Sequence, residues 1–248
     1  MKYFPKKLTM TWIRNSYKEG SLTPEELAGE IVRRAEKYRD YNIWIVAPDL
    51  KRMMGYIEKL PKDMESLPLW GIPFAVKDNI DVAGSPTTAA CPDYAYDPKE
   101  DAAVVKKLIE AGAFPVGKTN LDQFATGLVG TRSPYGEVKN ALDPELISGG
   151  SSSGSAVSVA LGMAAFSLGT DTAGSGRVPA ALNCLVGYKP SLGAWSTKGV
   201  VPACASLDCV TVFANSLEDA EKVNLAARGV AEAVSYTHLR AHETRGNL

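Results

Sequence analysis

Residues 149–175 read GGSSSGSAVSVALGMAAFSLGTDTAGS, and the fold follows from this stretch. Its middle, residues 156–168, is apolar except for two serines and one glycine, whereas serines cluster at both ends. A flexible linker is rich in Gly and Ser throughout and has no such apolar centre. The stretch therefore predicts a buried unit with polar, functional ends.

The length of this stretch predicts how its two ends are arranged. A helix over roughly residues 152–164 would be about 20 Å long. A strand over residues 165–170 would also span about 20 Å. A helix running out and a strand running back would bring Ser175 to the same end as Ser151. We therefore expect the two serine clusters to meet, although other layouts have compatible lengths.

Composition and charge indicate an ordinary soluble domain. The chain has 248 residues, 45% hydrophobic and 22% charged, with a formal net charge of −1. This size suits one large domain, and the charge balance favours neither nucleic acid nor an anionic membrane as partner. No uninterrupted apolar run reaches the ~18 to 20 residues of a membrane span, and the N-terminus lacks the apolar core of a signal peptide. Four widely spaced cysteines without that signal predict reduced thiols in a cytoplasmic protein.

Both histidines, His238 and His242, lie in a C-terminal segment that departs from the preceding pattern. Residues 235–248 read SYTHLRAHETRGNL and resemble translated adapter or vector sequence, with a native tail as the alternative. We therefore assign residues 1–234 to the domain. Without the tail the chain contains no histidine, which excludes Ser-His-Asp and Cys-His catalysis and the usual zinc sites. No metal is expected.

Helical and strand-like segments alternate along the chain. Thr23-Pro24-Glu25-Glu26 combines an N-cap, a proline at the first helical position and a capping-box glutamate. The further segments are a helix over 24–40, a β-rich run at 42–46, a helix over 49–60, a buried strand over 71–76 ending at Lys77, a helix from Asp101 to a C-cap at Gly112, and a strand over 113–116. This alternation predicts an α/β fold with a parallel or mixed sheet.

Residues 112–119, GAFPVGKT, fit the phosphate-binding pattern G-x-x-x-x-G-K-[ST] letter for letter. A phosphate loop needs a strand before its first glycine and a helix opening at the Lys-Thr pair. Here an amphipathic helix precedes Gly112, and the intervening residues are an apolar β-like run. We therefore interpret the match as a helix cap followed by a strand.

Four blocks resemble the defining motifs of the amidase signature family, in that family's order and spacing: IPFAVKDN (72–79), GKTN (117–120), SGGSSSGSA (148–156) and GTDTAGSGRVPAA (169–181). The similarity covers about residues 20 to 230. It implies the amidase-signature α/β fold, a mixed sheet with helices on both faces, of which about the first half is present. It also implies amide hydrolysis through an acyl-enzyme, without a cofactor.

The same resemblance assigns roles by motif. It implies Ser175 as nucleophile, Ser151 as a bridging serine after a cis peptide bond at Gly150–Ser151, and Lys77 as base. The implied oxyanion donors are the backbone N–H groups of Thr172, Ala173, Gly174 and Ser175.

Elementary chemistry supports a lysine base. A serine hydroxyl needs a neighbouring base, and lysine serves only when neutral, so its usual pKa of about 10.4 must fall by several units. Lys77, at the end of an apolar strand, is placed for such desolvation. The alternative is a surface pair of Lys77 with Asp78 or Asp81.

Other residues near the site have structural or weaker assignments. Ser152 or Ser153 is expected to cap the buried helix. Asp171 and Arg177 are expected to be a structural pair that holds the loop. The predicted substrate pocket comprises Ala125, Thr126, Gly127 and Ser152.

Three further strings, at 81–96, 120–136 and 198–214, resemble the allophanate hydrolases within the family. Ala205 departs from the arginine expected there. This resemblance implies a small amide substrate in urea degradation, a functional link to urea carboxylase and a homodimer in the full-length protein. The alternatives are the A subunit of a tRNA-dependent amidotransferase, a short-chain amidase, and an inactive truncated fragment, because domains of this family have about 400 or more residues.

Overall fold

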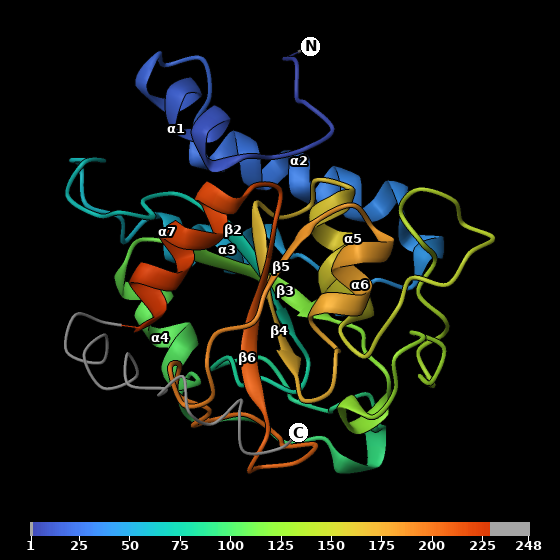
Figure 1. Cartoon of the computed structure of the whole chain (residues 1–248). Coiled ribbons are helices and arrows are strands. Elements are labelled where there is room, and N and C mark those ends of the chain that lie inside the picture. Colours follow the sequence, from blue (N-terminus) through green and yellow to red (C-terminus); the bar gives the residue numbers. More distant parts are fainter. Residues whose placement is uncertain (1, 229–248) are drawn as a thin grey trace, which may run out of the picture.

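A six-stranded sheet forms the centre of the computed structural model, which describes residues 2–228 (Figure 1). The proposed foreign tail, residues 235–248, lies outside the described residues. The strands follow the spatial order β1-β3-β2-β4-β6-β5. Their bounds are Trp44–Val46 (β1), Pro73–Lys77 (β2), Phe114–Thr119 (β3), Phe166–Asp171 (β4), Val186–Tyr188 (β5) and Cys209–Ala214 (β6).

The sheet is mixed, as predicted. Strand β2 pairs in parallel with both β3 and β4, whereas β1 pairs antiparallel with β3 and β6 pairs antiparallel with β4 and β5. All residues of the four inner strands are buried, which explains their almost continuous apolar sequences. Because β2 and β4 are parallel neighbours, their C-terminal ends, at Lys77 and Asp171, lie at the same end of the sheet.

Helices cover both faces of the sheet, as predicted (Figure 1). Helices α5 and α6 lie on one side, and α4 and α7 lie on the other. The helix bounds are Met10–Lys18 (α1), Pro24–Lys37 (α2), Leu50–Ile57 (α3), Ala103–Glu110 (α4), Ser153–Ala160 (α5), Arg177–Leu182 (α6) and Leu217–Arg228 (α7), with 3-10 turns at Arg39–Tyr41, Pro92–Tyr94 and Gln123–Ala125. No helix of the described chain is long and apolar enough to cross a membrane.

The central stretch does form a helix and a returning strand, α5 and β4, and every residue of both is buried. The predicted helix end near residue 164 was wrong, because α5 ends at Ala160. Gly162 ends it by adopting a φ of +70°, a backbone conformation that favours glycine. A Cβ at this position would also lie 2.1 Å from Nη1 of Arg34, so the turn packs closely against α2.

Two local predictions at helix starts had different outcomes. The capping box was confirmed: Thr23 Oγ1 accepts from the Glu26 N–H, and Glu26 accepts from the Thr23 N–H. The predicted start at Asp101 was wrong, because α4 begins at Ala103. The Asp101 carboxylate instead accepts from the backbone N–H of Ala83 at 2.8 Å, a contact 18 residues away.

The phosphate-loop pattern forms a strand, as we expected. Lys118 and Thr119 belong to β3, which extends three residues beyond the predicted end at residue 116, and no helix opens at this pair. Lys118 is buried and pairs with the Asp78 carboxylate at 3.1 Å. Its ammonium group also donates to Thr87 Oγ1 at 3.0 Å. Lys118 therefore has a structural role at the end of β3.

Candidate active site

Lys77 is the last residue of β2, and its side chain is fully buried. Its Nζ lies 2.8 Å from Ser151 Oγ and 2.8 Å from Thr170 Oγ1. Thr170 is on β4, the neighbouring strand, and Ser151 lies just before α5. Lys77 therefore does not form a surface ion pair, because its side chain is buried and the Asp78 carboxylate contacts Lys118 instead.

Burial lowers the pKa of Lys77 from 10.5 to about 7. Three nearby carboxylates, those of Asp122, Asp171 and Asp208, oppose this shift because they stabilise the protonated amine. Desolvation outweighs the three charges together. A large fraction of Lys77 is therefore neutral near pH 7, as a general base requires.

The two serine clusters meet, as the lengths predicted. The backbone N–H of Ser152 donates to the carbonyl of Ser175 at 3.3 Å. The peptide bond between Gly150 and Ser151 is cis, as the motif implied. Ser175 is buried, and its hydroxyl donates to the Gly127 carbonyl at 3.4 Å rather than to Ser151 Oγ. Lys77 and Ser151 are thus in direct side-chain contact, and the backbone of Ser175 lies beside that of Ser152.

Asp171 and Arg177 hold the loop that carries Ser175. Two carboxylate–guanidinium contacts of 2.9 Å join them, and Asp171 also accepts from the backbone N–H groups of Gly174, Gly176 and Arg177. Burial raises the pKa of Asp171, but the Arg177 guanidinium and these amides outweigh it and hold the pKa below its usual range. The carboxylate is therefore ionised at neutral pH and fastens the loop.

This arrangement reduces the number of backbone N–H groups that are free to bind an oxyanion. The N–H of Gly174 donates to Asp171 at 2.7 Å, so it is already engaged. Within the described chain, the N–H groups of Thr172, Ala173 and Ser175 make no hydrogen bond. These three remain the candidates for receiving a developing negative charge.

The four predicted pocket residues divide into two groups. Ala125, Thr126 and Gly127 belong to the loop beside Ser175, since Gly127 accepts its hydroxyl. Ser152 is fully buried; its hydroxyl donates to the Thr170 carbonyl at 3.1 Å and accepts from the Thr170 N–H at 3.3 Å. The prediction that the Ser152 or Ser153 side chain caps α5 was wrong, because the helix has no side-chain cap.

Sequence reasoning missed three polar residues at this site: Thr170, Asp122 and Asp208. Thr170 contacts Lys77 directly. Asp208 is buried and accepts from Thr172 Oγ1 and from the N–H groups of Ala203 and Cys204, which ties another loop to the predicted oxyanion segment. A polar residue at the end of a buried strand was the available signal for Thr170. The two aspartates lie inside strings already singled out by resemblance, at 120–136 and 198–214.

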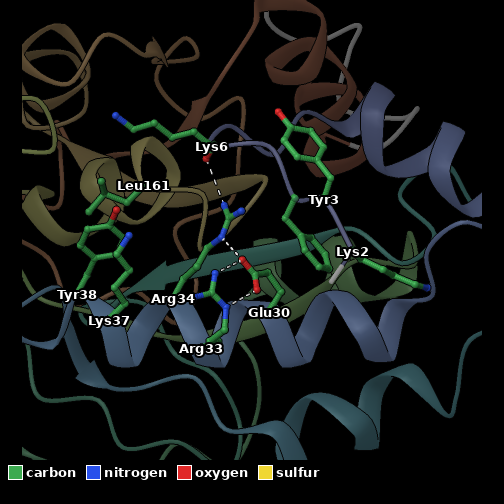
Figure 2. Close-up of a pocket in the computed structure, with 10 residues that line it drawn as sticks. Lys2, Tyr3, Lys6, Glu30, Arg33, Arg34, Lys37, Tyr38 and Leu161 are labelled. Carbon is green, nitrogen blue, oxygen red and sulfur yellow. Dashed lines mark hydrogen bonds and ion pairs between the residues drawn. The ribbon is translucent and has the colours of Figure 1, made fainter.

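A separate hollow of about 580 Å³ lies beside α2 and the N-terminal segment, away from these residues (Figure 2). Basic side chains predominate in its lining. Arg34 is buried there, pairs with Glu30 at 2.7 Å, and donates to the carbonyls of Pro5, Lys6 and Gly162. Its hydrogen bonds thus fasten the N-terminal segment to α2 and to the turn after α5.

The profile of the family described as Amidase matches residues 26–240. A urea amidolyase of Saccharomyces cerevisiae is 60% identical over 183 residues, which is 73% of this chain and 10% of the yeast protein. The A subunit of the glutamyl-tRNA(Gln) amidotransferase of Methanosarcina acetivorans is 40% identical over 215 residues, 86% of this chain and 44% of that protein.

Solved structures of other proteins have the same fold as this chain. The selenomethionine-substituted allophanate hydrolase of Kluyveromyces lactis superposes with a TM-score of 0.79 at 48% identity. That match covers 90% of this chain and 37% of the hydrolase chain. The chain therefore spans less than half the length of each of these relatives.

Proposed function

Because this chain belongs to the amidase family, we propose that it is the catalytic part of an amidohydrolase that cleaves allophanate to ammonia and CO2 in urea degradation. The observation that supports this most directly is the buried Lys77 amine, held 2.8 Å from Ser151 Oγ beside Ser175. Identity of 60% to a urea amidolyase, against 40% to the amidotransferase relative, supports allophanate over the alternative substrate.

The proposed reaction begins with a proton relay. Neutral Lys77 takes the proton of Ser151, and Ser151 takes that of Ser175, whose Oγ attacks the terminal amide carbonyl carbon. This relay requires the Ser175 side chain to rotate from the Gly127 carbonyl towards Ser151. The oxygen of the tetrahedral intermediate faces the unengaged backbone N–H groups of the 172–175 segment.

Collapse of the intermediate breaks the C–N bond. The proton held on Lys77 returns through Ser151 to the departing nitrogen, which leaves as ammonia. Water then attacks the acyl-serine with the same lysine as base, which releases the carboxylated product and restores Ser175. That product loses CO2 to give carbamate, and carbamate breaks down to a second ammonia and a second CO2, which completes the proposed overall reaction. A reaction that carboxylates urea, such as that of urea carboxylase, would supply the substrate.

The test is ammonia release from allophanate by the full-length protein, with Ser175→Ala and a matched Ser191→Ala variant at an exposed position. We expect Ser175→Ala to lose at least about 10⁴-fold in rate, as removal of a serine nucleophile does elsewhere, and Ser191→Ala to retain full activity. Turnover retained in Ser175→Ala would contradict the nucleophile assignment. Ammonia release from glutamine but not from allophanate would instead favour the amidotransferase alternative.

A further inference from the structure

Asp122 lies just beyond β3 and is fully buried. Its backbone N–H donates to the carbonyl of Ser151 at 3.0 Å. Its carboxylate accepts from the N–H of Gly130 at 3.1 Å and from the N–H of Arg132 at 2.8 Å. One residue thus connects the Ser151 backbone to the loop that follows Gly127.

Two glycines pack directly against this carboxylate. A Cβ at Gly150 would lie 2.1 Å from Asp122 Oδ2, and a Cβ at Gly127 would lie 2.6 Å from the same oxygen. Any side chain at either position would therefore displace the carboxylate. Gly150 also donates through its N–H to Leu128 O at 2.8 Å, so the cis Gly150–Ser151 segment and the 127–132 loop meet at Asp122.

We propose that Asp122 is a positioning residue for the proposed amide hydrolysis. Its carboxylate fastens the 127–132 loop to the Gly150–Ser151 backbone, and its negative charge acts on the Lys77 amine. The expected effect of Asp122 on the rate of amide hydrolysis rests on the proposed function. Its attachment of the loop and its effect on the Lys77 amine do not. Gly127 is the link to the nucleophile, since its carbonyl accepts the Ser175 hydroxyl.

Asp122 differs from Asp171 and Asp208, the other carboxylates that act on Lys77, and from the neighbouring Asp78, in how its charge is balanced. Asp171 forms an ion pair with Arg177, and Asp78, adjacent to Lys77 in the chain, forms one with Lys118. Asp208 accepts from Thr172 Oγ1 and two backbone N–H groups. Asp122 contacts only backbone N–H groups and forms no ion pair with any described residue.

Among the charges that raise the pKa of Lys77, that of Asp122 has the largest effect, followed by Asp171 and Asp208. Removing it should therefore lower the protonation midpoint of the lysine. A neighbouring unit charge inside a protein shifts such a midpoint by about one pH unit or more. Replacing the carboxylate with an amide also leaves one acceptor oxygen for the N–H groups of Gly130 and Arg132, which should loosen the loop.

The experiment titrates Lys77 directly in the full-length protein. Lysine labelled with ¹³C at Cε is followed by NMR against pH, and the Lys77 signal is identified by its absence from Lys77→Met. We expect Asp122→Asn to lower the midpoint by about one pH unit. Asp40→Asn, the same charge change at an exposed position, should leave it unchanged. An unchanged midpoint in folded Asp122→Asn would overturn the electrostatic part of the proposal.

Asp122→Glu tests positioning separately, because it keeps the charge but moves the carboxylate by one methylene. We expect the Lys77 midpoint to stay within about 0.3 pH units of wild type, while kcat/KM for amide hydrolysis falls at least tenfold. Full kcat/KM in Asp122→Glu would overturn the positioning role, even if Asp122→Asn failed to fold. If wild type releases no ammonia, the proposed function fails, whereas the NMR midpoints still decide whether Asp122 acts on Lys77.

Discussion

Replacing Lys77 with methionine should abolish activity and yet stabilise the protein at neutral pH. A lysine whose pKa is 10.5 in the unfolded chain and about 7 in the folded protein disfavours folding by about 4 kcal/mol at pH 7. Methionine avoids this cost but loses the two hydrogen bonds to Ser151 and Thr170, worth about 1 kcal/mol each. The net expectation is a gain of about 2 kcal/mol in the free energy of unfolding at pH 7.

The sign of this effect depends on pH. Between the folded and unfolded pKa values of Lys77, the unfolded chain binds more protons, so the stability of the wild-type protein rises with pH in this window. The stability advantage of Lys77→Met should therefore shrink above pH 7 and cross zero at about pH 9. Above about pH 10.5 the variant should be about 2 kcal/mol less stable, because only the lost hydrogen bonds remain.

Urea unfolding at a series of pH values from 7 to 10 measures this crossover. The matched control is Lys106→Met at an exposed position on α4, for which we expect a difference near zero at every pH. A stability difference for Lys77→Met that does not change with pH would refute the assignment of a neutral, desolvated lysine. The same result would remove the physical basis for Lys77 as a base.

Further measurements test the amide hydrolysis activity and the phosphate-loop pattern at residues 112–119. In amide hydrolysis, kcat/KM should fall about tenfold per pH unit below about pH 7 and level off above it, because only neutral Lys77 accepts a proton. A rate that rises towards acid pH would contradict this. Gly117→Ala should lower the free energy of unfolding by about 1 to 3 kcal/mol in urea, because its Cβ would lie 2.5 Å from Val46 O. Millimolar MgATP should leave the melting temperature of wild type unchanged, because Lys118 is buried against Asp78; a rise of several degrees would contradict the strand interpretation.

The elements that local sequence predicted well are those in which burial alone determines the pattern. The apolar runs before Lys77 and before Asp171 form buried strands, as predicted, and Ser151 and Ser175 lie at one end of the helix–strand unit, as the lengths predicted. The capping box at Thr23 is likewise complete within four residues, so no distant contact decides it.

The errors arise where a distant partner competes with a local preference. Ser152 precedes a helix and by local preference would cap it, but the backbone of Thr170, 18 residues away, takes its hydroxyl. Gly162 ends α5 against Arg34, which is 128 positions distant. Asp122 and Asp208 were missed for the same reason: their hydrogen bonds join loops whose proximity only the folded sheet creates.

The two contacts of the Lys77 amine have a consequence for the fate of the proton in the proposed reaction. Ser151 Oγ leads towards Ser175, whereas Thr170 Oγ1 contacts only donors, namely Lys77 Nζ and, at 3.4 Å, Asn79 Nδ2. A proton on this amine therefore has one polar exit, and solvent does not reach the nitrogen. In the proposed reaction, the hydrogen removed from the nucleophile would be stored in a dry site and delivered to the leaving nitrogen before exchanging with bulk water. Each catalytic cycle would then retain its own proton, independently of the buffer.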